Sequence, residues 1–346
     1  MSPRGAARTG RLNAGLVTAA GVILLAVSVV TAITFGPADL TMGQVWSVLA
    51  HELHLAGDPG LTALEEAMVW QLRLPRVLLA AACGAALSIC GVIMQSLLRN
   101  PLAEPYLLGV SSGASVGAVV VLVMGVGTTL GLSGGAFVGA LAAFAIMLTL
   151  ARLAGGTTDK IVLSGVAVTQ GFSALTSFII MVGADANTTR GVLYWLMGSL
   201  ASASWADVAQ TMAAFAVIMV LAMGMAGSLD AFTFGERQAA SLGVAVMRTR
   251  VSLLVLAALL TAIVVASSGA IGFVGLVLPH MARMLVGTRH RGVLPVSAVL
   301  GAIFLLWADT IARSAFAPLE VPVGVITAMV GVPVFAALLA RRRGSR

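Results

Sequence analysis

Few residues in this chain have the types and spacing that enzymatic chemistry requires. Residues 109–113 match the G-x-S-x-G pattern of serine hydrolases, whose nucleophile must follow a strand in a soluble α/β sheet. Here Pro105 opens an apolar stretch that predicts a membrane helix, so we interpret the match as a coincidence. The histidines form no H-E-x-x-H motif and no triad with an acidic partner on one helix; they are His51, His54, His280 and His290. We therefore do not expect an intramembrane enzyme.

The sequence also lacks a phosphate-binding loop and a metal-binding motif. Lys160 is the only lysine and follows Asp159, so G-x-x-x-x-G-K-S/T is absent and the chain does not hydrolyse ATP in that way. Cys83 and Cys90 lie in an apolar stretch without C-x-x-C spacing, and we expect them to be packing residues. We expect no cofactor and no metal ion in this chain.

The composition indicates the class of protein that must position these residues. Hydrophobic residues make up 59% of the chain and charged residues only 10%, and apolar runs of bilayer length recur from end to end. Backbone groups in lipid must be satisfied internally, so the runs predict helices. The net charge of +7 comes from basic residues at the ends of the runs, which is typical of helix anchoring and not of nucleic-acid binding. The sequence predicts an all-α polytopic membrane protein.

About ten transmembrane helices are predicted, and no soluble domain fits between them. The first apolar run is too long for a cleaved signal peptide and suits a first span. The predicted spans are 14–35, 75–97, 106–125, 131–151, 161–183, 205–226, 251–270, 273–287, 294–312 and 322–340. The eighth is short, and its turn at 271–275 predicts a broken helix that lines a cavity. Residues 41–55 and 61–73 predict interfacial helices, and small-residue pairs such as Gly113/Gly117 and Gly135/Gly139 predict close helix packing.

Basic residues are distributed unevenly across this topology. Four of the 20 fall on one side, at Arg73, Arg76, Arg190 and Arg313. The remaining sixteen share the other side: Arg4, Arg8, Arg11, Arg99, Arg152, Lys160, Arg237, Arg248, Arg250, Arg283, Arg289, Arg291, Arg341, Arg342, Arg343 and Arg346. The positive-inside rule makes that side cytoplasmic, and with ten spans both termini lie there.

Four motifs carry a resemblance to a known family. They are R-L-P-R at 73–76, N-P-L-A-E-P at 100–105, G-A-I-G-F-V-G-L-V-L-P-H at 269–280 and V-P-V-G at 321–324. Together they resemble the FecCD-type permeases, the membrane subunits of type II ABC importers for iron–siderophores, haem and vitamin B12. The resemblance covers nearly the whole chain, so residues 1–346 are expected to form one transmembrane permease domain.

The resemblance implies a division of labour between subunits. Two permeases form a dimer in the bacterial inner membrane and bind two separate ATPase subunits, which hold ATP and Mg²⁺. A substrate-binding protein delivers cargo from outside. The family's docking arginines match Arg73, Arg76 and Arg313. Arginine suits this role because a guanidinium group stays charged and can form bidentate contacts with the carboxylates of a binding protein. Arg190 has no family counterpart and is interpreted as a helix anchor.

The resemblance also implies a cytoplasmic coupling segment at 227–250. It contains an E-x-x-A-x-x-x-G pattern, and a short helix there would seat in a cleft of the ATPase with Glu236 and Arg237 available for polar contacts. An amphipathic surface helix explains the pattern equally well when it is taken alone. The predicted coupling residues are Gly235, Glu236, Arg237, Ala239, Ala240 and Gly243.

The pathway and its gates follow from the same resemblance. Polar residues fall within an arc of roughly 120° on the fifth span, which lines the pore in the family; they are Thr169, Gln170, Ser173, Thr176 and Ser177. Hydrogen bonding between helices is an equally good explanation of this stripe. The cytoplasmic gates match Asn100, Leu102, Thr157, Thr158 and Asp159. Asp159 departs from the small neutral residue expected there.

We therefore expect an importer permease for an iron chelate, either a siderophore or haem, with vitamin B12 as the alternative. His280 follows Pro279 in a motif that the family shares whatever its cargo, so we do not interpret it as a haem ligand. An ion-coupled secondary transporter is the alternative from another class, and Asp309 is the one candidate acid for it. We expect Asp309 to pair with Arg313 or a neighbouring helix. The motifs do not distinguish a homodimer from a heterodimer.

Overall fold

A computed structural model describes residues 12–36, 40–55, 57, 60–125, 129–316 and 319–343. Four of the residues assigned above to the basic side, Arg4, Arg8, Arg11 and Arg346, lie outside the described residues. Every regular element in these ranges is helical.

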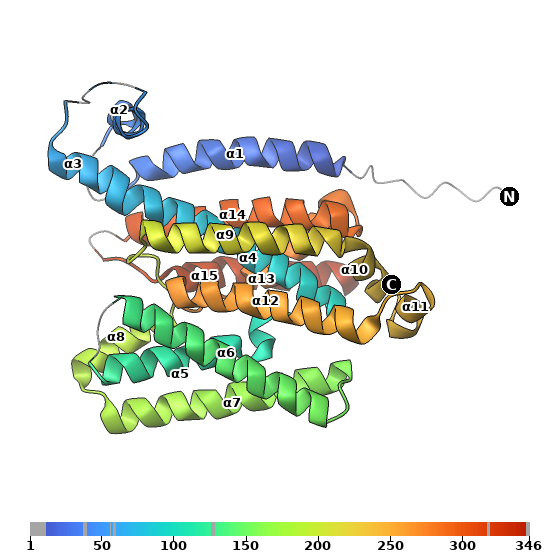
Figure 1. Ribbon diagram of the computed structural model, residues 1–346. Helices are drawn as coiled ribbons and strands as arrows, with labels where there is room; N and C mark the ends of the chain where they lie inside the picture. The colour runs from blue at the N-terminus through green and yellow to red at the C-terminus, as the bar shows by residue number, and fades with distance from the viewer. Residues whose placement is uncertain are drawn as a thin grey trace.

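Each predicted span coincides with a helix of the bundle (Figure 1). These helices are α1 (Ala14–Thr34), α4 (Leu74–Leu97), α5 (Val110–Val123), α6 (Thr129–Leu153), α7 (Thr158–Gly183), α9 (Trp205–Gly224), α12 (Val246–Ser268), α13 (Val274–Val286), α14 (His290–Ser314) and α15 (Val323–Arg343). Among the described residues, seven helices are long and apolar enough to cross a membrane, while α5, α13 and α15 contain shorter apolar stretches. The shorter elements are α2 (Met42–Glu52), α3 (Ala63–Ala67), the π-helix η1 (Met68–Arg73), the 3₁₀-helix η2 (Pro105–Leu108), α8 (Ala186–Leu196), α10 (Ala226–Thr233) and α11 (Glu236–Ser241).

Helix α4 forms the core of the bundle. It packs against α14, α9, α12 and α13, and almost all of its residues are buried, including the free thiols of Cys83 and Cys90. Close approach is possible because glycine faces backbone at two crossings. Gly84 lies against Gly301 of α14, and Gly91 lies against Gly275 of α13. Without side chains at these points the helix backbones come into direct contact.

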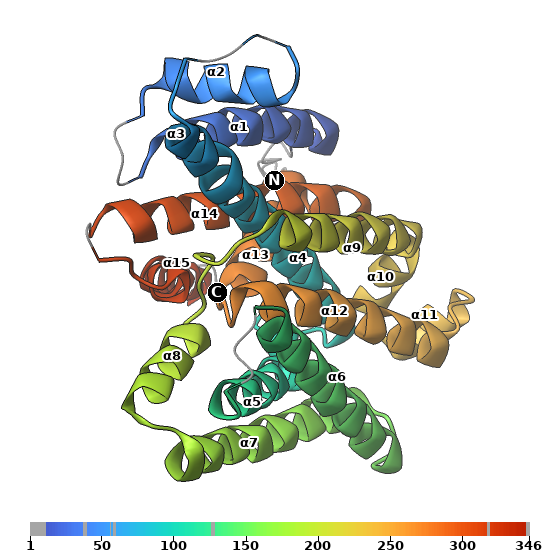
Figure 2. The ribbon, with the colours of Figure 1, turned by 60° about the vertical axis from the view of Figure 1, so that its left-hand side comes forward.

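Helices α5, α6 and α7 form a separate lobe beside the core (Figure 2). The predicted small-residue pairs meet each other there: Gly113 of α5 faces Gly139 of α6, and Gly117 faces Gly135. The prediction of close packing is confirmed at these positions. One face of α7 remains exposed on the far side of the lobe.

The interfacial helix predicted at 61–73 is not separate from the second span. Helix α3 continues through η1 directly into α4. Leu74, which precedes Pro75, has helical angles, φ −65° and ψ −49°, although the residue before a proline usually avoids them. The π-helical turn changes the hydrogen-bond register just before Pro75, so the helix tolerates the missing N–H of Pro75.

The break predicted at 271–275 lies between α12 and α13 and is packed within the protein. Gly269 and Phe273 both have positive φ angles, 67° and 69°. The hydroxyl of Tyr106 donates to the carbonyl of Ile271 over 2.8 Å and accepts from the same residue's N–H over 2.8 Å. One side chain therefore satisfies both polar groups of a non-helical residue.

The two ends of the bundle differ. Helices α10 and α11 lie at the end where α1 begins and α15 ends (Figure 1), and the N–H of Leu12 there binds the carbonyl of Leu285 near the end of α13. We call this the α11 end. Helices α2 and α3 lie at the opposite end, which we call the α2 end.

Candidate functional site

At the α2 end, charged residues from three segments form an arginine cluster, consisting of Arg73, Arg76, Asp309, Arg313 and Glu320. The Nε of Arg76 lies 3.0 Å from Oδ2 of Asp309, and its Nη2 lies 3.0 Å from Oδ1. The Nη1 of Arg76 lies 3.2 Å from Oε2 of Glu320. The Nε of Arg313 is 3.8 Å from Asp309 Oδ2. Asp309 is thus held between two guanidinium groups, which confirms that it pairs with Arg313 and with a neighbouring helix.

Two of these arginines also bind the end of α1. The last carbonyls of a helix have no partner within it and attract positive charge. Arg73 Nη1 donates to Ile33 O over 3.0 Å. Arg313 donates to Phe35 O over 2.8 Å and to Ala32 O over 2.7 Å. The sequence did not predict this structural role, because no sequence pattern relates α1 to these arginines.

The three predicted docking arginines therefore lie together, but they are mostly buried. Arg73 is 5% exposed and Arg313 is 6% exposed. All three line a pocket of about 170 Å³ together with Glu320. A carboxylate that entered this pocket would meet guanidinium groups already fixed in position. Their docking role remains a prediction. Arg190 is exposed on α8, away from this pocket.

At the α11 end, the predicted coupling segment folds into two short helices, α10 and α11. Gly235 precedes α11 with φ 104°, and Gly243 follows it with φ 84°. The N–H of Val244 binds Ala239 O and that of Gly243 binds Ala240 O, each over 3.0 Å, which is a Schellman motif. Ala239 is buried, whereas Arg237 and Ala240 are exposed.

Glu236 was expected to be available to an ATPase, but its carboxylate is bound within the chain. It forms an ion pair with Arg250 of α12. It also accepts a hydrogen bond from the Thr158 hydroxyl over 3.0 Å. Arg250 in turn donates to Gly156 O over 2.9 Å. The sequence did not predict these contacts, because the partners are 14 and 78 residues away and no pattern on α11 reveals them, and the coupling role of Glu236 stays a prediction.

The two predicted gate segments both lie near the start of α11. Thr157 precedes α7, and Asp159 is exposed in its first turn. In the other segment, the side chain of Asn100 accepts from Leu102 N–H over 2.9 Å, and Leu102 is 45% exposed. Arg99, next to Asn100, lowers the pKa of Glu236 electrostatically, after the larger effect of Arg250. Thr158 of one segment therefore contacts this carboxylate, and Arg99 beside the other acts on it electrostatically.

The polar stripe on α7 divides between two surroundings. Gln170, Ser173 and Ser177 are exposed on the open face of the lobe, and Thr169 is half-buried. Thr176 is buried, and its hydroxyl donates to Phe172 O over 2.9 Å. A lining role therefore remains a prediction for the first four, and Thr176 is less accessible to any pathway.

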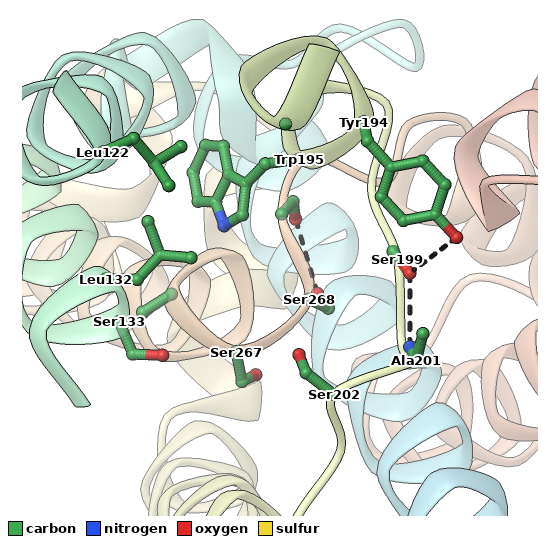
Figure 3. A pocket seen from close by; sticks show the side chains of 13 residues that line it. Leu122, Leu132, Ser133, Tyr194, Trp195, Ser199, Ala201, Ser202, Ser267 and Ser268 are labelled. Carbon is green, nitrogen blue, oxygen red and sulfur yellow. Dashed lines mark hydrogen bonds between the residues drawn. The ribbon is translucent and has the colours of Figure 1, made fainter. Parts of the chain in front are cut away.

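A hydroxyl-rich pocket was not anticipated from the sequence. It has a volume of about 230 Å³ and lies between α8, the end of α12 and the lobe (Figure 3). Trp195 and Tyr194 come from α8, while Ser267 and Ser268 come from α12. The segment after α8 is held against the end of α12, because the N–H of Ser199 donates to Ser268 O over 2.8 Å. The serine-rich stretches at 199–204 and 267–268 were the available signal.

The fold also assembles a serine, a histidine and an aspartate from three helices. His290 Nδ1 lies 2.6 Å from Asp230 Oδ1, and Nε2 lies 2.5 Å from Ser96 Oγ. Ser96 also donates to Val92 O over 2.9 Å, so its proton is used within its own helix. A nucleophile would need that proton to pass to the histidine. We interpret the group as a connection of α10 to α4 and α14.

Comparisons with known proteins identify relatives over almost the full length. The model of the FecCD transport family matches residues 24–341. The cobalamin import system permease protein BtuC of Halobacterium salinarum is 38% identical, and the match covers 94% of this chain and 95% of that protein. The hemin transport system permease protein HmuU of Yersinia pestis is 37% identical, with coverage of 97% and 99%. A solved structure described as an inward-facing metal-chelate type ABC transporter superposes with a TM-score of 0.82 at 28% identity, covering 94% of this chain and 99% of that one.

Proposed function

Because the chain belongs to the FecCD transport family and is a membrane permease of the ABC importer type, we propose that it carries an iron chelate, a siderophore complex or haem, into the cytoplasm. Residues 1–346 act as one transmembrane domain of ten spans with both termini in the cytoplasm. A second permease copy or a paralogue completes the pore. ATP and Mg²⁺ are bound by two ATPase subunits, and a substrate-binding protein delivers the cargo.

The observation that carries this proposal is the segment formed by α10 and α11. It is a helical projection at one end of an apolar bundle, and Arg237 and Ala240 are exposed on it. A permease without a phosphate-binding loop needs such a surface to receive work from a separate ATPase. The basic residues at this end support a cytoplasmic location, where ATP is available.

The relatives support the proposed cargo and its alternative. The hemin relative and the metal-chelate structure favour an iron chelate, whereas the similar identity of the cobalamin relative supports vitamin B12 as the alternative. An ion-coupled secondary transporter is less well supported. Asp309, its one candidate acid, is 1% exposed and is occupied by Arg76 and Arg313. An acid that binds a transported ion must become accessible to water.

Reconstitution tests the proposal directly. The chain, co-expressed with its ATPase, is placed in liposomes with ATP enclosed in the lumen, and the binding protein and cargo are added outside, so that only complexes whose ATPase faces the lumen take up cargo. Haemin, ferric dicitrate and cyanocobalamin are the probes. We expect vanadate-sensitive uptake of one of the iron chelates. Uptake that persists without the ATPase, driven by an ion gradient, would refute the proposal.

The coupling surface supports one prediction. Replacing Ala240 with tryptophan should reduce the amount of co-purified ATPase about tenfold, since overpacking an interface by one large side chain costs about 1–3 kcal/mol. The chain should still fold, because Ala240 is exposed. Leu64→Trp is the matched control, because Leu64 is 72% exposed on α3 at the opposite end. Equal ATPase recovery from both variants would argue against an interface at α11.

A second prediction concerns docking. Arg73→Gln removes the charge and keeps a polar amide in its place, and it should weaken the binding protein's affinity in nanodiscs about tenfold, as expected for a lost hydrogen bond to a charged group. The effect should shrink at high salt. Arg190→Gln, which removes an exposed charge on α8, should change the affinity less than about twofold. If both variants bind as the unmodified chain does, the cluster is not the docking site.

A further inference from the structure

Glu236 lies where three segments of the α11 end meet. It is the first residue of α11, and Gly235 before it adopts a φ of 104° that only glycine takes readily. Its Oε1 atom accepts from the hydroxyl of Thr158 in the first turn of α7 over 3.0 Å. The same atom pairs with Arg250 in the first turns of α12. One carboxylate on α11 thus contacts two other helices, α7 and α12.

Arg250 completes a closed loop of contacts. Its guanidinium is 3% exposed and also donates to Gly156 O over 2.9 Å, in the connection that leads into α7. Glu236 and Arg250 therefore hold the start of α7 twice, once through the Thr158 side chain and once through the backbone. Separating them would leave a buried guanidinium without its carboxylate, which is strongly unfavourable.

The other predicted gate segment follows Arg99, which lies near the start of α11. A side chain at Gly235 would lie 3.3 Å from the Nη1 of Arg99, so this arginine extends to the start of α11. Arg250, Thr158 and Arg99 all lower the pKa of Glu236, with the hydrogen bond to Arg250 the largest cause. Glu236 is therefore ionised at neutral pH, and its carboxylate attracts the guanidinium groups of Arg250 and Arg99.

We propose that Glu236 is a positioning residue, which with Arg250 and Thr158 forms a latch that makes α11 and the start of α7 move as one body. The inference rests on the proposed function, in which α11 is the surface that receives the motion of the ATPase. The latch passes this motion to residues 156–159 without an intervening flexible loop. The family pattern on α11 places a glutamate beside the ATPase; the geometry points instead to a carboxylate directed into the permease.

The latch can be tested on the chain alone in nanodiscs. Spin labels on Ser241→Cys and Lys160→Cys report the distance between α11 and α7; both positions are exposed, and the native Cys83 and Cys90 are buried. We expect one narrow distance distribution for the labelled chain. Glu236→Gln and Thr158→Val should broaden it or shift it by about 5 Å, one helical turn. Thr158→Ser restores the hydroxyl and should restore the narrow distribution.

A matched substitution controls for the loss of a hydroxyl group. Thr149→Val removes a hydroxyl that donates to Ala145 O within α6, and it should leave the distance narrow. If both Glu236→Gln and Thr158→Val give the same distribution as the labelled chain, the latch is overturned. The same holds if Thr149→Val broadens the distribution as much as Thr158→Val does.

The functional readout is the number of haemin or ferric dicitrate molecules that the reconstituted complex takes up per ATP hydrolysed. Thr158→Val should lower this ratio about fivefold, the equilibrium change that one net hydrogen bond corresponds to. ATP hydrolysis itself should continue, because the ATPase still binds α11. An unchanged ratio would contradict the latch. If the unmodified complex transports neither probe, the proposed function fails, while the distance measurement still decides on the latch.

Discussion

Asp309→Asn is expected to reduce the free energy of unfolding by about 3–5 kcal/mol, the usual cost of removing one partner from a buried ion pair. Asp309 is 1% exposed and is the carboxylate that balances both Arg76 and Arg313. Asparagine has nearly the same shape, so the change removes charge and leaves the packing intact. Two guanidinium groups would then face each other in a site with little water. Denaturant unfolding in mixed micelles measures the effect.

Glu320→Gln provides the matched control. Glu320 pairs with the same Arg76 but is 41% exposed, so its loss should cost less than about 1 kcal/mol. The double variant Arg76→Gln/Asp309→Asn removes charges of both signs and should lose less than the sum of the two single variants. Equal stability of Asp309→Asn and the unmodified chain would show that water reaches the cluster and compensates the arginines.

The bundle was largely predictable because lipid restricts what a backbone can do. An apolar run must be a helix there, and so hydropathy alone located a helix at each predicted span. Helix ends were less predictable, since they depend on single residues. The second span was predicted to begin at residue 75, but η1 joins it to α3 in one continuous helix, and Gly109, with φ 77°, delays α5 until after η2.

The sites were predictable only where their partners are local in sequence. Asp309 and Arg313 are four residues apart on one helix, and that spacing was sufficient. The contact between Arg76 and Asp309 spans 233 residues, and that between Thr158 and Glu236 spans 78. Such pairs arise from the way helices pack, which one sequence does not reveal. For this reason the sequence identified the arginines and Glu236 as functional candidates but not their internal partners.

The largest packing effect is expected at the glycines of α4. Gly84→Ala would place a methyl group against the carbonyl of Gly301, and Gly91→Ala would place one against the carbonyl of Gly275, each closer than carbon and oxygen atoms can approach. The obstacle is backbone, so no side-chain rotation relieves it. Overpacking costs about 1–3 kcal/mol at a site that can adjust, and more where two helices must separate. We expect either variant to abolish the recovery of monodisperse protein.

Gly134→Ala tests whether the crossings, and not glycine in general, matter. Gly134 lies in α6, and a Cβ there would meet nothing within 4 Å. Alanine favours a helix over glycine by about 1 kcal/mol, so this variant should be as stable as the unmodified chain or slightly more stable. Fluorescence-detected size-exclusion chromatography after heating compares all three variants. If Gly84→Ala and Gly91→Ala elute and survive heating as Gly134→Ala does, α4 does not approach α14 and α13 through its glycines, and the core of the bundle must be packed in another way.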